Sequence, residues 1–168
     1  MKPKTTETDR TRCLVSACLL GLPCRYDGAG KPCGAVTSLA EKGAYLVPVC
    51  PEQLGGLPTP RTPAERQTDG TVRTADGHDV TENYLRGARM ALRLARLLDC
   101  RTAILKARSP SCGCGRIYDG SFSGRLTAGW GCAAELLKEA GLRVMTEEDL
   151  TFENPGREQS INGPEEDA

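Results

Sequence analysis

The sequence is poor in aromatic residues, has a single histidine and lacks long apolar stretches. Aromatic residues make up 4% of its 168 positions, and no apolar run approaches the roughly 20 residues that a bilayer-spanning helix needs. The first twelve residues, MKPKTTETDRTR, are polar and have no apolar core of the kind found in secretory signals. We therefore expect neither a membrane span nor an export signal, and a cytoplasmic location.

Glycine and proline are plentiful, with 19 and 11 copies, beside 39% hydrophobic residues. This composition is typical of a compact α/β domain with many functional loops, and it argues against a disordered protein or a helical bundle. A chain of this length suits one domain with one buried core. Polar, aperiodic ends predict a flexible N-terminal tail over residues 1–11 and a flexible acidic tail over 151–168, with the domain at 12–150.

The net charge of zero conceals an uneven distribution. Residues 147–168 hold eight of the 22 acidic residues but one of the 22 basic residues. A basic body with an acidic tail favours an anionic substrate such as a nucleotide. A solvated basic surface without a ligand explains the same pattern equally well.

Short apolar runs alternate with helical patterns along the chain. The runs predict buried strands at 13–17, 45–49, 103–106 and 142–145. Helices are predicted at 35–42, 82–98 and 133–140, and the apolar spacing of the second is the strongest. This alternation indicates a single three-layer α/β domain with a mainly parallel sheet. Pro48 has no backbone donor, which places the second strand at a sheet edge or end. A D-G turn predicts a small hairpin within 71–80.

Nine cysteines need an explanation, because a reducing compartment argues against a disulfide framework. Three of them, Cys18, Cys50 and Cys112, follow the ends of predicted strands. Ligands of open α/β sheets bind outside the carboxyl ends of the strands, so these thiols are expected to converge on one crevice. Three thiolates suit a soft metal centre, and they leave one iron of a four-iron cluster without a protein ligand.

Several segments, in order, resemble the thiouracil desulfidase family: VSACLLGLPCRYDG, VCPEQLGGLPTPR, GHDVTENYLRGA, LKARSPSCGCGRIYDGSFSG and GLRVMTEEDL. The resemblance covers residues 12–150. It implies an oxygen-sensitive 4Fe–4S cluster held by Cys18, Cys50 and Cys112. It also implies a non-redox reaction that converts thiouracil-like pyrimidines to uracil, with the sulfur transferred to the cluster and released as sulfide.

The same motifs contain candidate catalytic and substrate-binding residues. The resemblance implies acid–base roles for Glu52 and Ser109, and Glu52 lies two residues from a predicted ligand, close enough to activate water. Contacts to the pyrimidine are predicted for Tyr26, Asp27 and Arg61, although loop-stabilising hydrogen bonds explain these residues equally well. His78, in the predicted hairpin, is interpreted as a surface turn residue.

Alternatives remain open from the sequence. Cys24 or Cys114 would complete a closed four-thiolate site in a zinc-stabilised nucleic-acid-binding module without catalysis, and Cys33 is a further extra thiol. A thiol-redox pair of Cys112 and Cys114 would have an unusual one-residue gap. One face of the 82–98 helix carries four arginines, Arg86, Arg89, Arg93 and Arg96. This face suits either solvent or the phosphates of a thiolated transfer RNA. A thiopyrimidine base or nucleotide is the preferred substrate.

Overall fold

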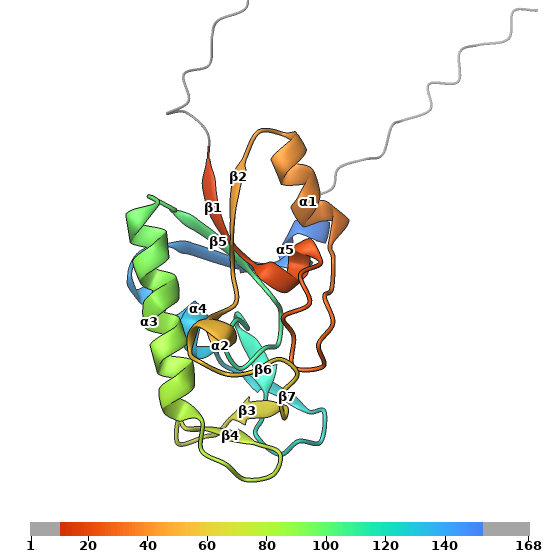
Figure 1. Ribbon diagram of the computed structural model, residues 1–168, viewed down its shortest axis with the longest axis vertical. Coiled ribbons are helices and arrows are strands. Elements are labelled where there is room, and N and C mark those ends of the chain that lie inside the picture. Colours follow the sequence, from red (N-terminus) through yellow and green to blue (C-terminus); the bar gives the residue numbers. More distant parts are fainter. Residues whose placement is uncertain (1–10, 153–168) are drawn as a thin grey trace, which may run out of the picture.

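The computed structural model describes residues 11–152, which form a central parallel sheet with helices on both faces (Figure 1). The strand order across the sheet is β2-β1-β5-β8, and all three neighbouring pairs run parallel. The four strands are β1 (Arg12–Ser16), β2 (Tyr45–Val49), β5 (Thr102–Leu105) and β8 (Arg143–Thr146). Each prediction of a main strand is confirmed within a residue or two. Pro48 lies in edge strand β2, as its missing donor predicted.

Alternating residues of the central strands bury both faces of the sheet. Leu14, Ala103 and Leu105 pack on one side with α3 (Thr81–Leu97) and α4 (Cys132–Glu139). Val15 and Ile104 point to the other side, where they meet α1 (Gly34–Glu41) and α5 (Glu147–Phe152). Successive residues of a strand face opposite sides of a sheet, so this pattern requires cover on both faces. The predicted three-layer α/β domain is therefore confirmed.

Two small antiparallel hairpins lie beyond the main sheet, and the sequence did not predict their partners. β3 (Ala64–Arg66) pairs with β4 (Val72–Thr74), and β6 (Arg116–Tyr118) pairs with β7 (Leu126–Ala128). The hairpin expected wholly within 71–80 is thus corrected: β4 has its main partner outside that segment, and one bridge between Arg73 and Asp79 closes the D-G turn. His78 sits in this turn with a side chain 77% exposed, in agreement with its predicted surface position.

Two glycines allow the short helix α2 (Pro51–Leu54) to pack directly on α3. A Cβ atom on Gly87 would lie 1.8 Å from the carbonyl oxygen of Pro51, and one on Gly55 would lie 2.0 Å from that of Asn83. Neither contact is physically attainable, so each position requires glycine. This close approach fixes the segment that follows β2 against the longest helix.

The described residues, 11–152, include the whole of the predicted domain at 12–150. α5 continues to Phe152, two residues beyond the expected end of the domain. The predicted tails otherwise lie outside the described residues. Within residues 11–152, none of the helices combines the length and the apolar character needed to cross a membrane.

Candidate active site

A cavity of about 610 Å³ lies at the carboxyl edge of three adjacent strands, β2, β1 and β5. Cys18, Cys50 and Cys112 all line it. Cys18 sits in the short 3-10 helix η2 (Ala17–Leu20) that follows β1, Cys50 directly follows β2, and Cys112 lies in the loop after β5. The structure therefore brings together the three cysteines that strand position singled out.

Cys50 lies close enough to Cys18 and Cys112 to oppose the ionisation of both. Burial, with a further contribution from Cys50, raises the pKa of Cys18 to about 11. Burial also raises the pKa of Cys112 well above its usual range, and Cys18 and Cys50 add to that rise, against a hydrogen bond with Ser16 that lowers it. Protonated thiols such as these lose their protons when they bind a metal centre, because the positive charge of the metal outweighs the repulsion between neighbouring thiolates.

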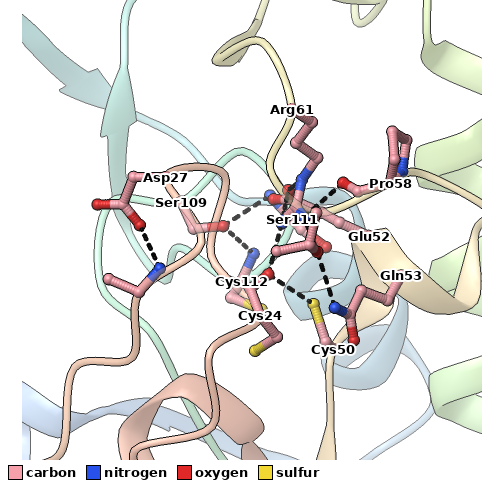
Figure 2. Close-up of polar contacts among 12 residues, drawn as sticks. Cys24, Asp27, Cys50, Glu52, Gln53, Pro58, Arg61, Ser109, Ser111 and Cys112 are labelled. Carbon is pink, nitrogen blue, oxygen red and sulfur yellow. Dashed lines mark hydrogen bonds and ion pairs between the residues drawn. The ribbon is translucent and has the colours of Figure 1, made fainter.

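Cys24 supplies a fourth thiol to the same cavity, where it is 5% exposed. Burial and then the neighbouring Cys50 and Cys18 raise its pKa to about 12. Its carbonyl oxygen accepts hydrogen bonds from Cys50 Sγ at 3.7 Å and from Arg61 Nη2 at 2.9 Å. Figure 2 shows the contact between Cys50 and the backbone of Cys24. Of the extra thiols left open by the sequence, this one belongs to the site.

The remaining cysteines lie elsewhere. Cys114 does not line the cavity, and its Sγ donates to the carbonyl oxygen of Val144 in β8 at 3.7 Å. Cys33 packs against the core cluster beneath α1. The last three cysteines are buried, one in each of the three core clusters: Cys13, Cys100 and Cys132. A Cys112–Cys114 redox pair has no support, because only the first of these thiols faces the cavity.

The donor set is of the kind that an iron–sulfur cluster uses. Among the described residues, no group of three or more histidine, cysteine or acidic side chains is arranged to hold one metal ion. The thiolate ligands of a four-iron cluster bind separate irons, so their sulfurs stand farther apart than those around one zinc. Soft thiolates spread round a buried cavity are the ligands that such a cluster uses. Cys18, Cys50 and Cys112 supply thiols of this kind to one cavity.

Glu52 and Arg61 form a well-buried ion pair on the wall of the cavity. The Nε and Nη2 atoms of Arg61 both lie 2.7 Å from Glu52 Oε2. Nη1 donates to the carbonyl oxygen of Pro58 and to Thr59 Oγ1, at 3.1 and 3.0 Å (Figure 2). All three guanidinium nitrogens of Arg61 are thus engaged within the protein, and they orient the carboxylate of Glu52.

Ser109 lines the cavity and organises the turn that carries Cys112. Its Oγ accepts hydrogen bonds from the backbone N–H groups of Ser111 and Cys112, at 3.1 and 3.0 Å (Figure 2). A hydroxyl oxygen that accepts two bonds keeps its own hydrogen to donate. Gly131 allows this turn to pack closely, since a Cβ atom there would lie 2.6 Å from the backbone nitrogen of Cys112.

The two remaining predicted substrate contacts are placed differently. Tyr26 lines the cavity and is 44% exposed, with the guanidinium of Arg25 over its ring. Asp27 is not among the lining residues, and its carboxylate accepts from the backbone N–H of Ala29 at 3.0 Å and pairs with Arg25. The geometry of Asp27 is that of a loop-stabilising residue.

Residues 13–149 match the sequence family described as 2-thiouracil desulfurase. The chain belongs to this family. The resemblance seen in the motifs is therefore confirmed. The match covers nearly all of the three-layer domain, including every residue that lines the cavity.

Two relatives extend this result. The chain is 46% identical over 147 residues to YbbK of Bacillus subtilis strain 168, described as an uncharacterised protein, and the match covers 82% of this chain and 96% of YbbK. A solved structure described as the [4Fe-4S]-dependent thiouracil desulfidase TudS is also 46% identical, with a TM-score of 0.79, and covers 85% of this chain and 95% of its own. These similarities favour the iron–sulfur desulfidase interpretation over the zinc-stabilised module.

Sequence reasoning missed several residues of the cavity wall. Tyr84 from α3 lines the cavity and is 2% exposed, and burial and the nearby Glu52 raise its pKa above the usual range. Glu65 from β3 and Phe122 from the β6–β7 loop also line the cavity. Phe122 lies within the segment GRIYDGSFSG that carries the family resemblance, a signal that was available. Nothing in the local sequence distinguishes Glu65 from a surface acid.

Proposed function

We propose that this chain is a 4Fe–4S-dependent desulfidase that converts thiouracil-like pyrimidines to uracil and sulfide. The observation that carries the proposal is the convergence of Cys18, Cys50 and Cys112 on one cavity at the carboxyl edge of adjacent parallel strands. The rise that neighbouring thiols cause in the pKa of Cys18 and of Cys112 supports it, as does the confirmed family membership. In the reaction, the oxygen of water replaces the sulfur on the ring carbon, with no net oxidation or reduction.

Cys18, Cys50 and Cys112 would hold the cluster, each as the ligand of one iron. When bound, the cluster supplies an iron without a protein ligand, which acts as a Lewis acid toward the C=S group. Lys106 also lines the cavity, and its ammonium lowers the pKa of Cys18, a smaller effect than burial. Its positive charge stabilises the anionic thiolates. Cys24 remains outside this ligand set.

Glu52 is the base that removes a proton from the attacking water. Its carboxylate is 14% exposed and oriented by Arg61, so it is held within the cavity and not mobile in solvent. A positioned base of this kind contributes roughly 10²–10⁴-fold to a rate. Ser109 donates its hydroxyl hydrogen to the substrate, since its oxygen already accepts two backbone N–H groups.

The substrate is a small thiopyrimidine, as a free base or a nucleotide. A cavity of about 610 Å³ has the size usual for small-molecule sites. Its lining includes Arg25, Lys31 and Arg108, which suit the negative charge of a nucleotide phosphate. Tyr26 contacts the substrate from the rim. The four arginines on α3 are exposed, and one of them pairs with Glu82, so they are interpreted as a solvated face.

Reconstitution with iron and sulfide under anaerobic conditions tests the proposal. The protein is expected to become brown and to release one sulfide per uracil formed from 2-thiouracil or 4-thiouracil. Air should bleach the protein and stop turnover. Cys18→Ala should lose both the brown colour and sulfide release. The matched control is Cys33→Ala, outside the cavity, which should keep both. A colourless protein with one zinc per chain and no sulfide release would refute the proposal.

A further inference from the structure

The loop between β6 and β7, residues 119–124, forms one wall of the cavity and is held in an unusual backbone conformation. Gly120, Phe122 and Gly124 all have positive φ angles, of 90°, 57° and 78°. Left-handed backbone is ordinary for glycine but uncommon for a bulky side chain, where it costs on the order of 1–3 kcal/mol. Such strain persists where the surrounding structure enforces it.

The enforcing group is a buried carboxylate. Glu65 is 8% exposed, and its Oε2 accepts hydrogen bonds from the backbone N–H groups of Gly120 and Phe122, at 2.9 and 3.0 Å. Gln67 adds a bond from Nε2 to the carbonyl oxygen of Gly120, at 3.3 Å. Burying a carboxylate is costly unless it is hydrogen-bonded, so hairpin β3–β4 uses its one buried acid to fix this loop.

The ring of Phe122 is available to a ligand. Phe122 lines the cavity, yet it is 39% exposed and belongs to none of the core clusters. A strained backbone that places an apolar ring at the edge of a cavity, instead of in the core, has no packing explanation. Flat nucleobases stack on aromatic side chains, and this contact depends on the face of the base and not on the groups attached to its edge.

We propose that Phe122 stacks on the pyrimidine ring of the substrate, and that Glu65 positions it by holding the 119–124 loop. This inference rests on the proposed function for the identity of the substrate. Phe122 is then a binding residue that discriminates planar aromatic rings from saturated ones. Glu65 acts through the loop and is a positioning residue.

The discriminating variant is Phe122→Gly, which removes the ring and relieves the positive φ. Because glycine adopts this conformation freely, the variant should unfold at no lower temperature than the wild type. Its dissociation constant for 2-thiouracil should nevertheless rise about tenfold, the effect expected from loss of one stacking contact. Binding is measured without oxygen by calorimetric titration of the cluster-loaded protein, with every variant and its reference in a Glu52→Gln background in which turnover is slow. Leu22→Ala, exposed and outside the cavity lining, is the matched control and should change neither quantity.

A second ligand isolates stacking from other contacts. 5,6-Dihydro-2-thiouracil keeps the C=S group and the polar edge of 2-thiouracil but has a puckered, saturated ring. The wild type should prefer the planar ligand, and Phe122→Gly should lose most of that preference. If the ratio of the two affinities is the same in Phe122→Gly as in the wild type, the proposal is overturned, even where both ligands bind more weakly.

The role of Glu65 is tested by a double-mutant cycle. Glu65→Gln should weaken 2-thiouracil binding in the wild-type background but have little further effect in Phe122→Gly, because both changes act through the same ring. Additive effects would refute the positioning role. These binding measurements are independent of turnover: a wild type that binds 2-thiouracil with ring preference but releases no sulfide would refute the proposed reaction and leave the stacking contact supported.

Discussion

Arg61 holds Glu52 by two nitrogens on a single oxygen, with Nε and Nη2 each 2.7 Å from Oε2. The same guanidinium fixes the carbonyl oxygens of Cys24 and Pro58. One arginine therefore ties together the loop after β1, the helix after β2 and the loop that precedes β3. The planar fork of arginine makes such multiple contacts possible, and lysine has no equivalent geometry.

Glu52→Gln should preserve the cluster and the fold while lowering kcat about a thousandfold, because the amide cannot accept a proton from water. On the same preparation, the rate of sulfide release checks the fall in kcat and the iron content checks that the cluster is preserved. Glu135→Gln is a suitable control, since Glu135 pairs with Arg66 outside the cavity lining. Retention of more than a tenth of the wild-type kcat would rule out Glu52 as the base.

Arg61→Lys should keep the positive charge but lose the orientation of Glu52. We expect a loss of about 2 kcal/mol in the free energy of unfolding, from the charged hydrogen bonds that lysine cannot replace. The decrease in activity should lie mainly in kcat. An increase confined to KM would instead indicate that Arg61 contacts the substrate, as the sequence alone first predicted.

The three cysteines at the strand ends could be predicted because their signal is local. Each apolar run is short and buried, and each is followed by a cysteine in a loop that contains glycine or proline. The parallel topology then brings the thiols together without further information. The edge position of β2 could also be predicted from a local signal, because the missing backbone N–H of Pro48 is evident from that one residue.

The second layer of the site could not be predicted, because its contacts join segments that are far apart in sequence and too short to show a pattern. β3 and β6 have three residues each, fewer than a periodic signal requires. Glu65 bonds to backbone N–H groups more than fifty residues away, at Gly120 and Phe122. Arg61 was singled out, but its carboxylate partner depends on how α2 packs.

Cys24→Ala distinguishes a three-ligand site from a closed four-thiolate site. If Cys24 lies beside the cluster without binding it, the alanine variant should retain about four irons per chain after reconstitution and the same visible absorption. Iron and zinc analysis check this against Cys50→Ala, which should lose the metal. Loss of all metal in Cys24→Ala would show that it is a ligand and would remove the open iron.

Gly87→Ala tests the packing that positions Cys50 and Glu52. The added methyl group would meet the carbonyl oxygen of Pro51 at 1.8 Å, so α2 must shift away from α3. We expect a loss of about 1–3 kcal/mol in unfolding free energy and a lower iron content. Arg93→Ala, on the exposed face of the same helix, should alter neither. Equal stability of Gly87→Ala and wild type would show that the close contact is not required.

The central claim, that three cysteines hold a cluster with one iron open to substrate, is tested most directly by an iron-57 Mössbauer spectrum of anaerobically reconstituted protein. The account predicts about four irons per chain, with a minority site distinct from the cysteine-bound irons. Addition of 2-thiouracil should change the signal of that site. A spectrum in which every iron is equivalent and unaffected by 2-thiouracil would contradict the account.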